Sequence, residues 1–358
     1  MNGSEPNIYE DPSDGEPAGV PDLAGGYLPV EGVYDEMLDP ATGIRPHWQG
    51  FLDGLSHMPA AEIEHSWDRA QRLIRENGVT YNVYDEAGGS TRPWRLDPLP
   101  FLISAEEWRV LEAGIIQRAK LLNTVVDDLY GAQRLVREGQ IPPALLYENP
   151  NFLRPVHGIT PPGDTHLHFI AVDLARAADN KWWVLGDRTQ APSGAGYALE
   201  NRVVMRRAIS NIYRNAPVQR LADFFQAFSD NLVAQPGRDD PLIVLLTPGP
   251  WNETYFEHAY VARYLGIPLV EGADLTVRDN KVYLKTLNGL KQVNLILRRV
   301  DGDFCDPLEL RTESLLGVAG LVAAIREGNV IVANSLGSGI VECEAMMSFL
   351  PGLCRFFF

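Results

Sequence analysis

Two short apolar stretches joined by a tight turn, within residues 166–202, constrain the fold of this chain more than any other segment. The first stretch leads to Asp173, and the second leads to Asp187 and Arg188. Residues 178–180 between them are Ala-Asp-Asn, a combination typical of a tight turn. We therefore expect an antiparallel hairpin that brings Asp173 and Asp187 together at its open end.

The predicted strands of this hairpin are residues 168–172 and 181–185, and the acids that follow them suggest its chemistry. Two carboxylates at one edge of a sheet repel each other unless a cation, an arginine or a shared proton lies between them. Mg²⁺ bound together with a nucleotide is a common solution. Asp173 and Asp187 are thus candidate metal ligands, and with Arg188 they are candidate nucleotide-binding residues. The alternative is that both acids are solvated residues at strand ends.

A helix is predicted directly after the hairpin, from Ser193 to about residue 215. The first amide groups of a helix have no partner within the helix, and the helix dipole favours negative charge at that end. Ser193 and Gly194 are therefore candidate ligands of a nucleotide phosphate.

Three further apolar stretches, residues 242–246, 293–297 and 330–333, have the continuous hydrophobic pattern of strands that are covered on both faces. Helical patterns lie between them. This alternation predicts an α/β fold in which a doubly wound sheet forms a substrate domain. In such a sheet ligands bind at the carboxyl ends of the strands, so the residues that follow each strand are candidate site residues.

The first candidates follow strand 242–246. Asn252 is a plausible N-cap with free amide groups behind it, and Glu253 and Glu257 lie one helical turn apart. We assign these three residues to substrate binding. The alternative is an ordinary capped helix.

The second candidates, Arg298, Arg299 and Asp301, follow strand 293–297. Adjacent side chains of a strand point in opposite directions, so only one of the two arginines can point into the crevice. An arginine at this position suits a substrate carboxylate or an acyl phosphate. Arg298 and Arg299 are therefore candidate catalytic residues and Asp301 a candidate substrate ligand, with a structural ion pair as the alternative.

The third candidates belong to the glycine-containing loop after strand 330–333: Ser335, Gly337, Ser338 and Gly339. Glycines after a strand allow backbone amides to approach an anion closely. The loop lacks the Lys-Ser/Thr pair of a phosphate-binding P-loop, so we assign it to substrate binding. A tight turn before a helix is the alternative. We expect this loop, Asn252 and one of the two arginines to line a single crevice.

The rest of the chain suggests three parts. Residues 1–30 are rich in Gly, Pro and acidic residues and are expected to form a disordered acidic arm. Ser104 and Glu107 form a capping-box pattern that predicts a long helix from residue 105 to about 137. We divide the remainder into a helical region that contains the hairpin, 31–235, and an α/β substrate-binding domain, 236–358.

Composition excludes several function classes. The chain has 31 Lys and Arg against 47 Asp and Glu, and its net charge of -16 argues against nonspecific binding to nucleic acid. Its three cysteines lack the spacing of a zinc site. His166 and His168 share a strand face without a third ligand, which favours satisfied strand histidines over a metal site. The sequence has no secretory or membrane-spanning pattern, so we expect a cytoplasmic protein.

Several phrases of the sequence, spread between Tyr34 and Cys354, occur together in the order of a known family: YDEMLDPATGIRPHW, RPWRLDPLP, LNTVVDDLYGAQRLVREGQIPP, GDRTQAPSGAGYALENR, TPGPWNETYFEH, ILRRVDGDFCDPLEL and NSLGSGIVE. On these phrases the chain resembles the circularly permuted ATP-grasp proteins of type 2, such as glutathionylspermidine synthetase. The resemblance implies a ligase that joins a carboxylate to an amine through an acyl phosphate, with ATP and Mg²⁺ as cofactors. It also implies small-molecule or peptide substrates and an association with other proteins of a peptide-modifying pathway.

The sequence departs from the pattern of that family in two places. Gly186 stands where the resemblance implies a glutamate ligand and Arg188 where it implies an asparagine, so a metal ligand is lost or moved to Asp187. The family's ATP-clamping lysines are absent, and an apolar Phe356–Phe358 ends the chain, so we expect a C-terminal truncation and no turnover of ATP. Gly186 and Arg188 favour the alternative that the chain is a degenerate ATP-grasp domain that binds a peptide or partner without catalysis. The sites at Asn252, Arg298 and the glycine-containing loop favour the ligase, which is our leading interpretation.

Overall fold

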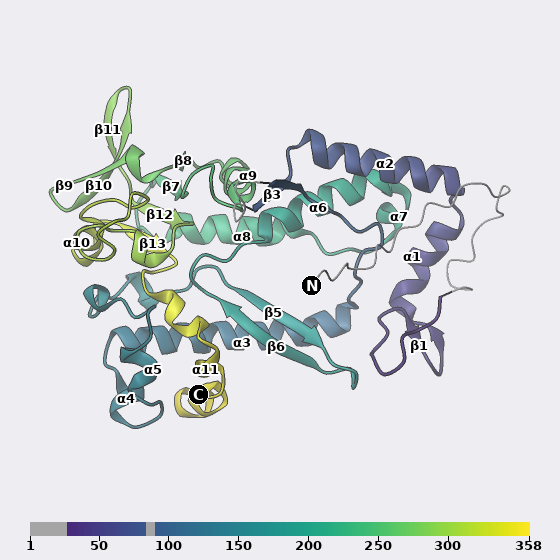
Figure 1. The fold of residues 1–358 in the computed structure, drawn as a ribbon, viewed down its shortest axis with the longest axis horizontal. Helices are drawn as coiled ribbons and strands as arrows, with labels where there is room; N and C mark the ends of the chain where they lie inside the picture. Colours follow the sequence, from purple (N-terminus) through teal and green to yellow (C-terminus); the bar gives the residue numbers. More distant parts are fainter. Residues whose placement is uncertain (1–26, 84–89) are drawn as a thin grey trace, which may run out of the picture.

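The computed structural model describes residues 27–83 and 90–358, and the chain forms two layers of helices around a parallel sheet, with a long helix and a hairpin beside it (Figure 1). Most of the predicted arm, residues 1–30, lies outside the described residues. Among the described residues, none of the helices combines the length and the apolar character needed to cross a membrane.

The parallel sheet has the strand order β13-β12-β7-β8, with β7 at Ile243–Leu246, β8 at Leu269–Val270, β12 at Leu295–Arg298 and β13 at Ile331–Ala333. Successive residues of a strand point to opposite faces. The core on one face contains Ile243, Leu245 and Leu297, whereas the core on the other contains Val244, Leu246 and Ile296. Both faces of the sheet are therefore covered, as the continuous apolar patterns predicted.

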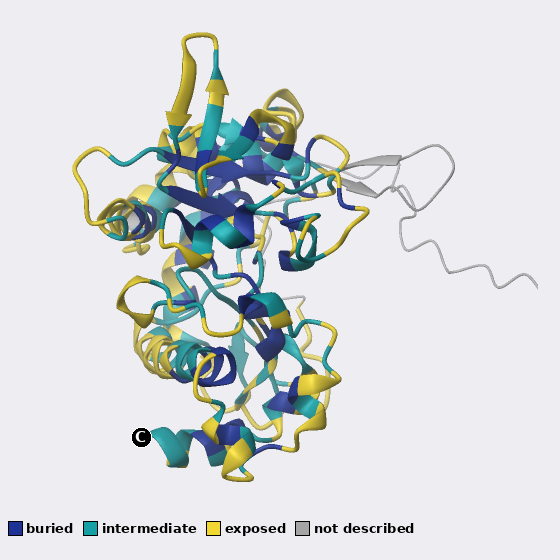
Figure 2. Cartoon of the chain, turned by 90° about the vertical axis from the view of Figure 1, so that its left-hand side faces the viewer, coloured by how far each residue is buried: buried dark blue, intermediate teal, exposed yellow. Residues whose placement is uncertain are grey.

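Helices from different parts of the chain cover the two faces of this sheet. On one face lie α8, Leu221–Ala234, and α9, Tyr255–Leu265, through residues such as Phe228 and Val261. On the other face lie α10, Leu321–Arg326, and the C-terminal half of α3, Ala105–Tyr130. Figure 2 shows the buried residues gathered inside the upper part of the molecule, where the sheet lies.

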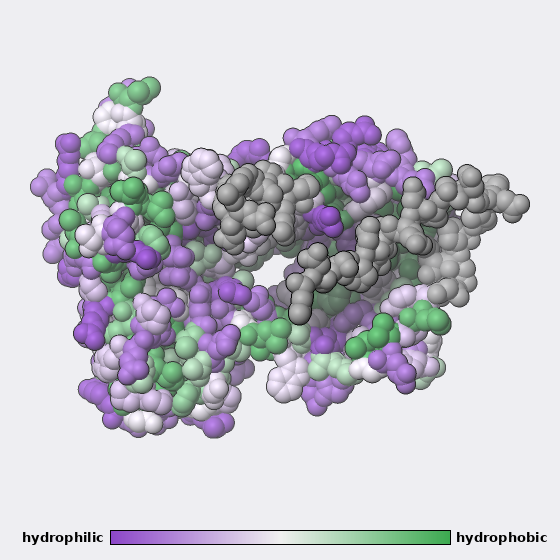
Figure 3. All heavy atoms as spheres, in the orientation of Figure 1, coloured by the Kyte–Doolittle hydropathy of each residue, from purple (hydrophilic) through white to green (hydrophobic). Residues whose placement is uncertain are grey.

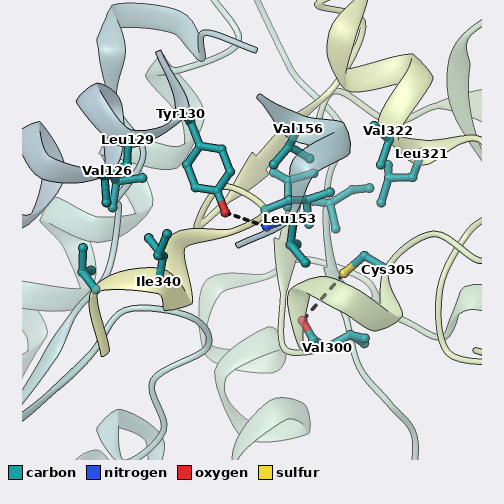
Figure 4. Packing of buried hydrophobic residues seen from close by; sticks show 14 of the residues in the cluster. Val126, Leu129, Tyr130, Leu153, Val156, Val300, Cys305, Leu321, Val322 and Ile340 are labelled. Atoms are coloured by element: carbon teal, nitrogen blue, oxygen red, sulfur yellow. Dashed lines mark hydrogen bonds between the residues drawn. The ribbon is translucent and has the colours of Figure 1, made fainter. Parts of the chain in front are cut away.

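Helix α3 begins at Ala105, as predicted, but ends at Tyr130, earlier than the predicted end near residue 137. The Ser104 side chain accepts a hydrogen bond from the amide of Glu107 at 3.2 Å, which confirms the capping pattern. Its C-cap is Gly131, and a separate short helix, α4, covers Arg134–Arg137. Leu122, Leu129 and other residues of α3 share one core with the sheet (Figure 4). Residues from both sides of the predicted domain boundary at 235 pack together in this core. The boundary itself stays a prediction.

The hairpin consists of β5, Ala171–Arg176, and β6, Trp182–Arg188, joined by the predicted turn. Both strands end later than predicted, and β5 begins at Ala171 where the prediction was residue 168, so Asp173 lies inside β5 and Asp187 inside β6. Leu185 has no partner on β5, because the register shifts by one residue there and forms a β-bulge. The hairpin lies across α3 in Figure 1.

Helices from residues before and after the hairpin pack against each other. Helix α2, Ala60–Glu76, packs on α6, Ala195–Ala208, and α1, Pro46–Ser56, lies beside α7, Ser210–Asn215. The remaining strands form small antiparallel sheets: β1 Leu38–Asp39, β2 Gly43–Ile44, β3 Thr80–Val83, β4 Ser90–Pro93, β9 Leu275–Arg278, β10 Lys281–Thr286 and β11 Gly289–Gln292. The remaining helices are short: α5 Ala144–Tyr147, α11 Glu344–Met347 and α12 Leu350–Phe357.

The apolar ending of the chain is less exposed than its sequence suggests. Helix α12 packs on α3, and Phe356 and Phe357 pack against the core that includes α3. The guanidinium of Arg134 lies 5.0 Å from the centre of the Phe356 ring. Only Phe358 of the three phenylalanines is exposed, at 68%. Phe356 and Phe357 are thus partly buried, and the expectation of a truncation stays a prediction.

Candidate functional site

The carboxyl ends of three parallel strands lie at one edge of the sheet, as predicted. Arg298 at the end of β12 pairs with Leu246 at the end of β7, and Leu297 pairs with Ala333 at the end of β13. The loops that carry the predicted site residues therefore start side by side. We refer to this region as the carboxyl edge.

Arg298 uses its guanidinium to hold the loop after β13. It is 1% exposed. It donates hydrogen bonds to the carbonyls of Asn334 at 2.8 Å, Val300 at 2.9 Å and Ser335 at 3.1 Å, and to the Ser338 hydroxyl at 2.9 Å. Burial lowers its pKa, although nearby acidic groups oppose this shift. Within the described residues no carboxylate lies at ion-pair distance from Arg298, so its donors serve the loop and give it the geometry of a positioning residue.

The glycines of this loop serve close packing. Gly337 has a φ of +81°, and a Cβ atom there would lie 2.1 Å from the Tyr130 hydroxyl. A Cβ atom at Gly339 would lie 3.2 Å from the side chain of Gln190. Ser338 is fully buried, and only Ser335 is partly accessible within the loop. The alternative interpretation, a tight turn, therefore describes Gly337, Ser338 and Gly339 better than an open anion-binding loop.

The segment after the hairpin docks on the same loop. The Thr189 hydroxyl donates to the Ser338 carbonyl at 2.8 Å, and the Thr189 carbonyl accepts from the Ser338 hydroxyl at 2.8 Å and the Asn334 amide group at 2.7 Å. The amides of Thr189 and Gln190 both donate to the Glu342 carboxylate, at 2.5 and 2.6 Å. These contacts fix the open end of the hairpin to the carboxyl edge.

Glu257 occupies the helix N-terminus that the sequence offers to a phosphate. It is fully buried and accepts hydrogen bonds from the amides of Gly194 at 2.8 Å and Gly196 at 2.9 Å. Its carboxylate also lies 3.7 Å from the Arg299 guanidinium. Two amides at the start of α6, those of Gly194 and Gly196, are thus already bonded to a carboxylate, while Ser193 is exposed. Arg299 and Glu257 form the structural ion pair that was the alternative for this arginine.

Asn252 takes part in a buried chain of hydrogen bonds rather than capping a helix. Helix α9 begins at Tyr255, and the Asn252 side-chain oxygen accepts from the Thr254 hydroxyl at 2.8 Å. The His258 ring lies between the hydroxyls of Thr254 at 3.2 Å and Thr247 at 2.9 Å. Burial, helped by the charge of Arg299, lowers the pKa of His258 to about 3. The histidine is therefore neutral at pH 7, with Nε2–H donating and Nδ1 accepting as the network requires.

The hairpin places its two aspartates on opposite faces. Asp173 pairs with Gly186, and Asp187 pairs with Val172, the neighbour of Asp173. Asp187 is buried and accepts two hydrogen bonds from Arg118 on α3, both at 2.6 Å. Asp173 forms an ion pair with Arg188 at 3.0 Å. The prediction that the two aspartates approach each other and share one ion is therefore wrong, because one residue of separation along a strand turns the side chain to the other face.

The face of the hairpin that carries Asp173 is open. Trp183 and Leu185 on β6 are 60% and 61% exposed. The side chains of Asp173 and Arg188 are 48% and 62% exposed. Figure 3 shows hydrophobic residues at the surface over β6. We refer to Asp173, Trp183, Leu185 and Arg188 as the open face, which combines an ion pair with an apolar surface.

The described side chains do not fit a resident metal ion. Mg²⁺ takes oxygen ligands in an octahedral arrangement, commonly one or two carboxylates together with phosphate oxygens and water. Within the described residues, no three His, Cys, Asp or Glu side chains come together as a metal site. On the open face Asp173 offers one carboxylate, which is paired with Arg188. A cation there would need its other ligands from a bound molecule.

Two of the predicted substrate residues remain exposed at the carboxyl edge. Glu253 follows β7 and Asp301 follows β12. Four residues that hold the site together were not among the predicted ones: Arg118, Thr189, Asn334 and Glu342. They form the hydrogen bonds that fix the hairpin to α3 and to the loop after β13. Asn334 could have been selected, since it directly follows β13. Arg118 gave no signal, because it lies on a helix 69 residues before its partner.

Comparison with known proteins identifies the family. The family model described as circularly permuted ATP-grasp type 2 matches residues 100–358. Proteins of the ATP-grasp families generally use ATP and Mg²⁺. The match covers the hairpin, the parallel sheet and every candidate site residue.

Relatives of this chain are longer proteins of unassigned activity. The uncharacterized protein Rv2567 of Mycobacterium tuberculosis is 42% identical over 330 residues, which cover 89% of this chain and 37% of that protein. The uncharacterized protein Rv2411c of the same organism is 38% identical, over 91% of this chain and 59% of its own length. The uncharacterized protein sll0335 of Synechocystis is 35% identical, over 90% and 68% respectively. The chain thus spans little more than a third of the first relative and about three fifths of the second.

A solved structure supports the same fold. The glutathione synthetase-like effector GSS30 from Globodera pallida, in its apo form, superposes with a TM-score of 0.52 at 14% sequence identity. The match covers 84% of this chain and 68% of the effector chain. Together with the family match and the mixed helix and strand architecture, it shows that this chain belongs to the circularly permuted ATP-grasp type 2 family and has an ATP-grasp-like α/β fold.

Proposed function

We propose that this chain is the hairpin and substrate-binding part of an ATP-dependent ligase, which joins a carboxylate to an amine through an acyl phosphate. ATP, brought as its Mg²⁺ complex, binds against the open face of the β5–β6 hairpin. The observation that carries the proposal is the contrast between the two faces of this hairpin. One face is fixed to α3 by Asp187 and Arg118, whereas the other presents Asp173, Arg188 and an exposed tryptophan.

The open face has the chemistry that a nucleotide requires. A guanidinium can pair with phosphate oxygens, and the Asp173 carboxylate that it releases can bind a cation held by the same phosphates. Trp183 and Leu185 offer an apolar surface for a base. Nucleotide binding would replace the Arg188–Asp173 pair by an Arg188–phosphate pair and an Asp173–cation pair. This exchange needs only these two side chains to move, because neither of them is buried.

The carboxyl edge supports an amine as the second substrate. Glu253 and Asp301 are exposed there, after the adjacent strands β7 and β12. Carboxylates favour a cationic amine over a second anion. Ser335 is the accessible member of the loop after β13 and completes the proposed substrate contacts, whereas Arg298 and Arg299 act as positioning residues beneath them. We further propose that the protein acts in the cytoplasm on small-molecule or peptide substrates, beside other proteins of a peptide-modifying pathway, and without nucleic acid or membrane.

A second candidate is a non-catalytic module that binds a peptide or partner protein. The observation that favours it is that the protein itself uses two of the groups predicted to bind a nucleotide: the Gly194 amide donates to Glu257, and Arg188 pairs with Asp173. In that case the open face is a protein-binding surface, and nucleotide has no effect on the chain.

Nucleotide-dependent melting separates the two candidates. A ligand that binds only the folded chain stabilises it by about 2.7 kcal/mol at 100 times its dissociation constant. We expect ATP to raise the melting temperature, with a larger shift in Mg²⁺, and the variant Asp173→Asn to lose the Mg²⁺-dependent part. Asp179→Asn is the matched control, because Asp179 is an exposed aspartate at the turn of the same hairpin, paired with Lys181. No shift with wild-type protein, or equal shifts in both variants, would contradict the proposed site.

A further inference from the structure

A cavity of about 60 Å³ lies beside the edge strand β13, away from the open face. One wall is the segment of residues 156–166, and the other is formed by α10, β13 and the loop that follows β13, through Ser335 and Leu336. Its lining is mostly apolar and includes Val156, Ile159, Ile325, Val332 and Leu336. Figure 4 shows Val156 near Tyr130, whose side chain also lines the cavity.

His166 is the polar side chain buried most deeply in this wall. It is 3% exposed and lines the cavity. Its Nε2 atom lies 3.3 Å from the Asp127 carboxylate on α3, and its carbonyl accepts a hydrogen bond from the amide of Ser335 at 2.9 Å. Within the described residues, the structure gives its second ring nitrogen, Nδ1, no hydrogen-bond partner. Because His166 lines the cavity, Nδ1 is available to a ligand that enters it.

The surroundings of His166 determine what Nδ1 can bind. Burial lowers the pKa of His166, against the opposing charges of Asp127 and Asp164, so the ring is neutral at pH 7. Its neighbour His168 adds no positive charge there, because burial lowers the pKa of that ring as well. The Asp127 carboxylate only accepts, so the ring proton lies on Nε2 and Nδ1 is left as an acceptor. The cavity therefore combines apolar walls with one hydrogen-bond acceptor.

We propose that this cavity binds a small branched aliphatic alcohol, whose hydroxyl donates to Nδ1 of His166 while its carbon chain contacts the apolar wall. A single water-sized group needs about 10 to 15 Å³ in such a cavity, so the volume suits a molecule of about five non-hydrogen atoms. The site is independent of the nucleotide site on the hairpin. It adjoins the loop that Arg298 holds, because the Ser335 amide is bonded to His166.

Two ligands of equal size test the hydrogen bond. The probe 2-butanol donates a hydrogen bond, whereas 2-butanone has the same heavy atoms and only accepts. With methyl-labelled protein, we expect 2-butanol to shift the NMR signals of Val156, Ile325 and Leu336 with a millimolar dissociation constant. We expect 2-butanone to bind about five- to tenfold more weakly. An absence of saturable shifts at these methyl groups, or equal binding of the two probes, would overturn the proposal.

A pair of histidine variants tests the assigned residue. His166→Leu should abolish the preference for the alcohol, whereas His168→Leu should keep it, because His168 does not line the cavity. If His166→Leu does not fold, the wild-type protein gives the same information. The preference should decline once the pH falls below the pKa of His166, which burial holds under its ordinary value of about 6.5, and Nδ1 takes a proton. A preference that survives His166→Leu, or that is independent of pH, would show that another group receives the hydroxyl.

Discussion

The carboxyl edge of the parallel sheet and the open face of the hairpin differ in how their polar groups are used. At the carboxyl edge, Arg298, Glu257 and His258 are buried, and their polar atoms are bonded to other parts of the protein. On the open face, Asp173 and Arg188 pair with each other and have no other ion pair among the described residues, and both remain about half exposed. The comparison teaches that charged residues after a strand do not by themselves mark a ligand site. Their exposure separates residues that are free to contact a ligand from residues that hold loops.

The largest effect on stability is expected for Arg298→Met. The substitution leaves three carbonyls and one hydroxyl without their buried donor, which should cost about 4 kcal/mol of unfolding free energy. Urea denaturation measures this loss. Arg188→Met is the matched control on the open face and should change the free energy by less than about 0.5 kcal/mol. Similar losses in the two variants would remove the distinction between the two regions.

The two aspartates of the hairpin should respond differently to the same change. Asp187→Asn weakens a buried bidentate contact to Arg118 and should cost about 2 to 3 kcal/mol. Asp173→Asn breaks a half-exposed ion pair and should cost at most about 0.5 kcal/mol. Denaturation curves of both variants test this order. If Asp173→Asn is the more destabilising change, the assignment of the open and fixed faces is reversed.

Two glycines of the loop after β13, Gly337 and Gly339, should differ in how much an added methyl group lowers the stability. Gly337→Ala places a methyl group against the Tyr130 hydroxyl at a positive φ, and should cost about 2 kcal/mol. Gly339→Ala meets only the side chain of Gln190, so its cost should be lower. Thermal unfolding ranks the two variants. Equal melting temperatures would mean that the loop adjusts easily and is not held as described.

The last comparison concerns the pH dependence of stability, where the effect is near zero at pH 7 and grows only as the pH falls. The pKa of His258 is about 3 in the folded protein and about 6.5 in the unfolded chain, so the unfolded chain takes up the proton first as the pH falls. Below about pH 6.5 this residue should therefore lower the stability by about 1.4 kcal/mol per pH unit, and above that pH it should have no effect. His258→Gln removes this contribution, and the slope of unfolding free energy against pH should become shallower. An unchanged slope would show that His258 is not held neutral.

The sequence alone determined the main elements of the fold. The continuous apolar runs predicted β7, β12 and β13, because strands covered on both faces need hydrophobic residues at every position. The turn at residues 178–180 and the capping pattern at Ser104 predicted the hairpin and the start of α3. The phrases that resemble the circularly permuted ATP-grasp proteins gave the family, which the family match confirmed.

Tertiary structure decided what the candidate residues do. Sequence places Asp173 and Asp187 near the same end of one hairpin, but the register places them on opposite faces and the bulge at Leu185 shifts the pairing. The partner of Asp187 lies on α3, and the amides offered by α6 are bonded to Glu257 on α9. Such contacts join residues far apart in the chain and depend on how helices and sheets pack. Local sequence patterns carry no information about that packing, so they identified the candidate residues but not which of them are free to bind a ligand.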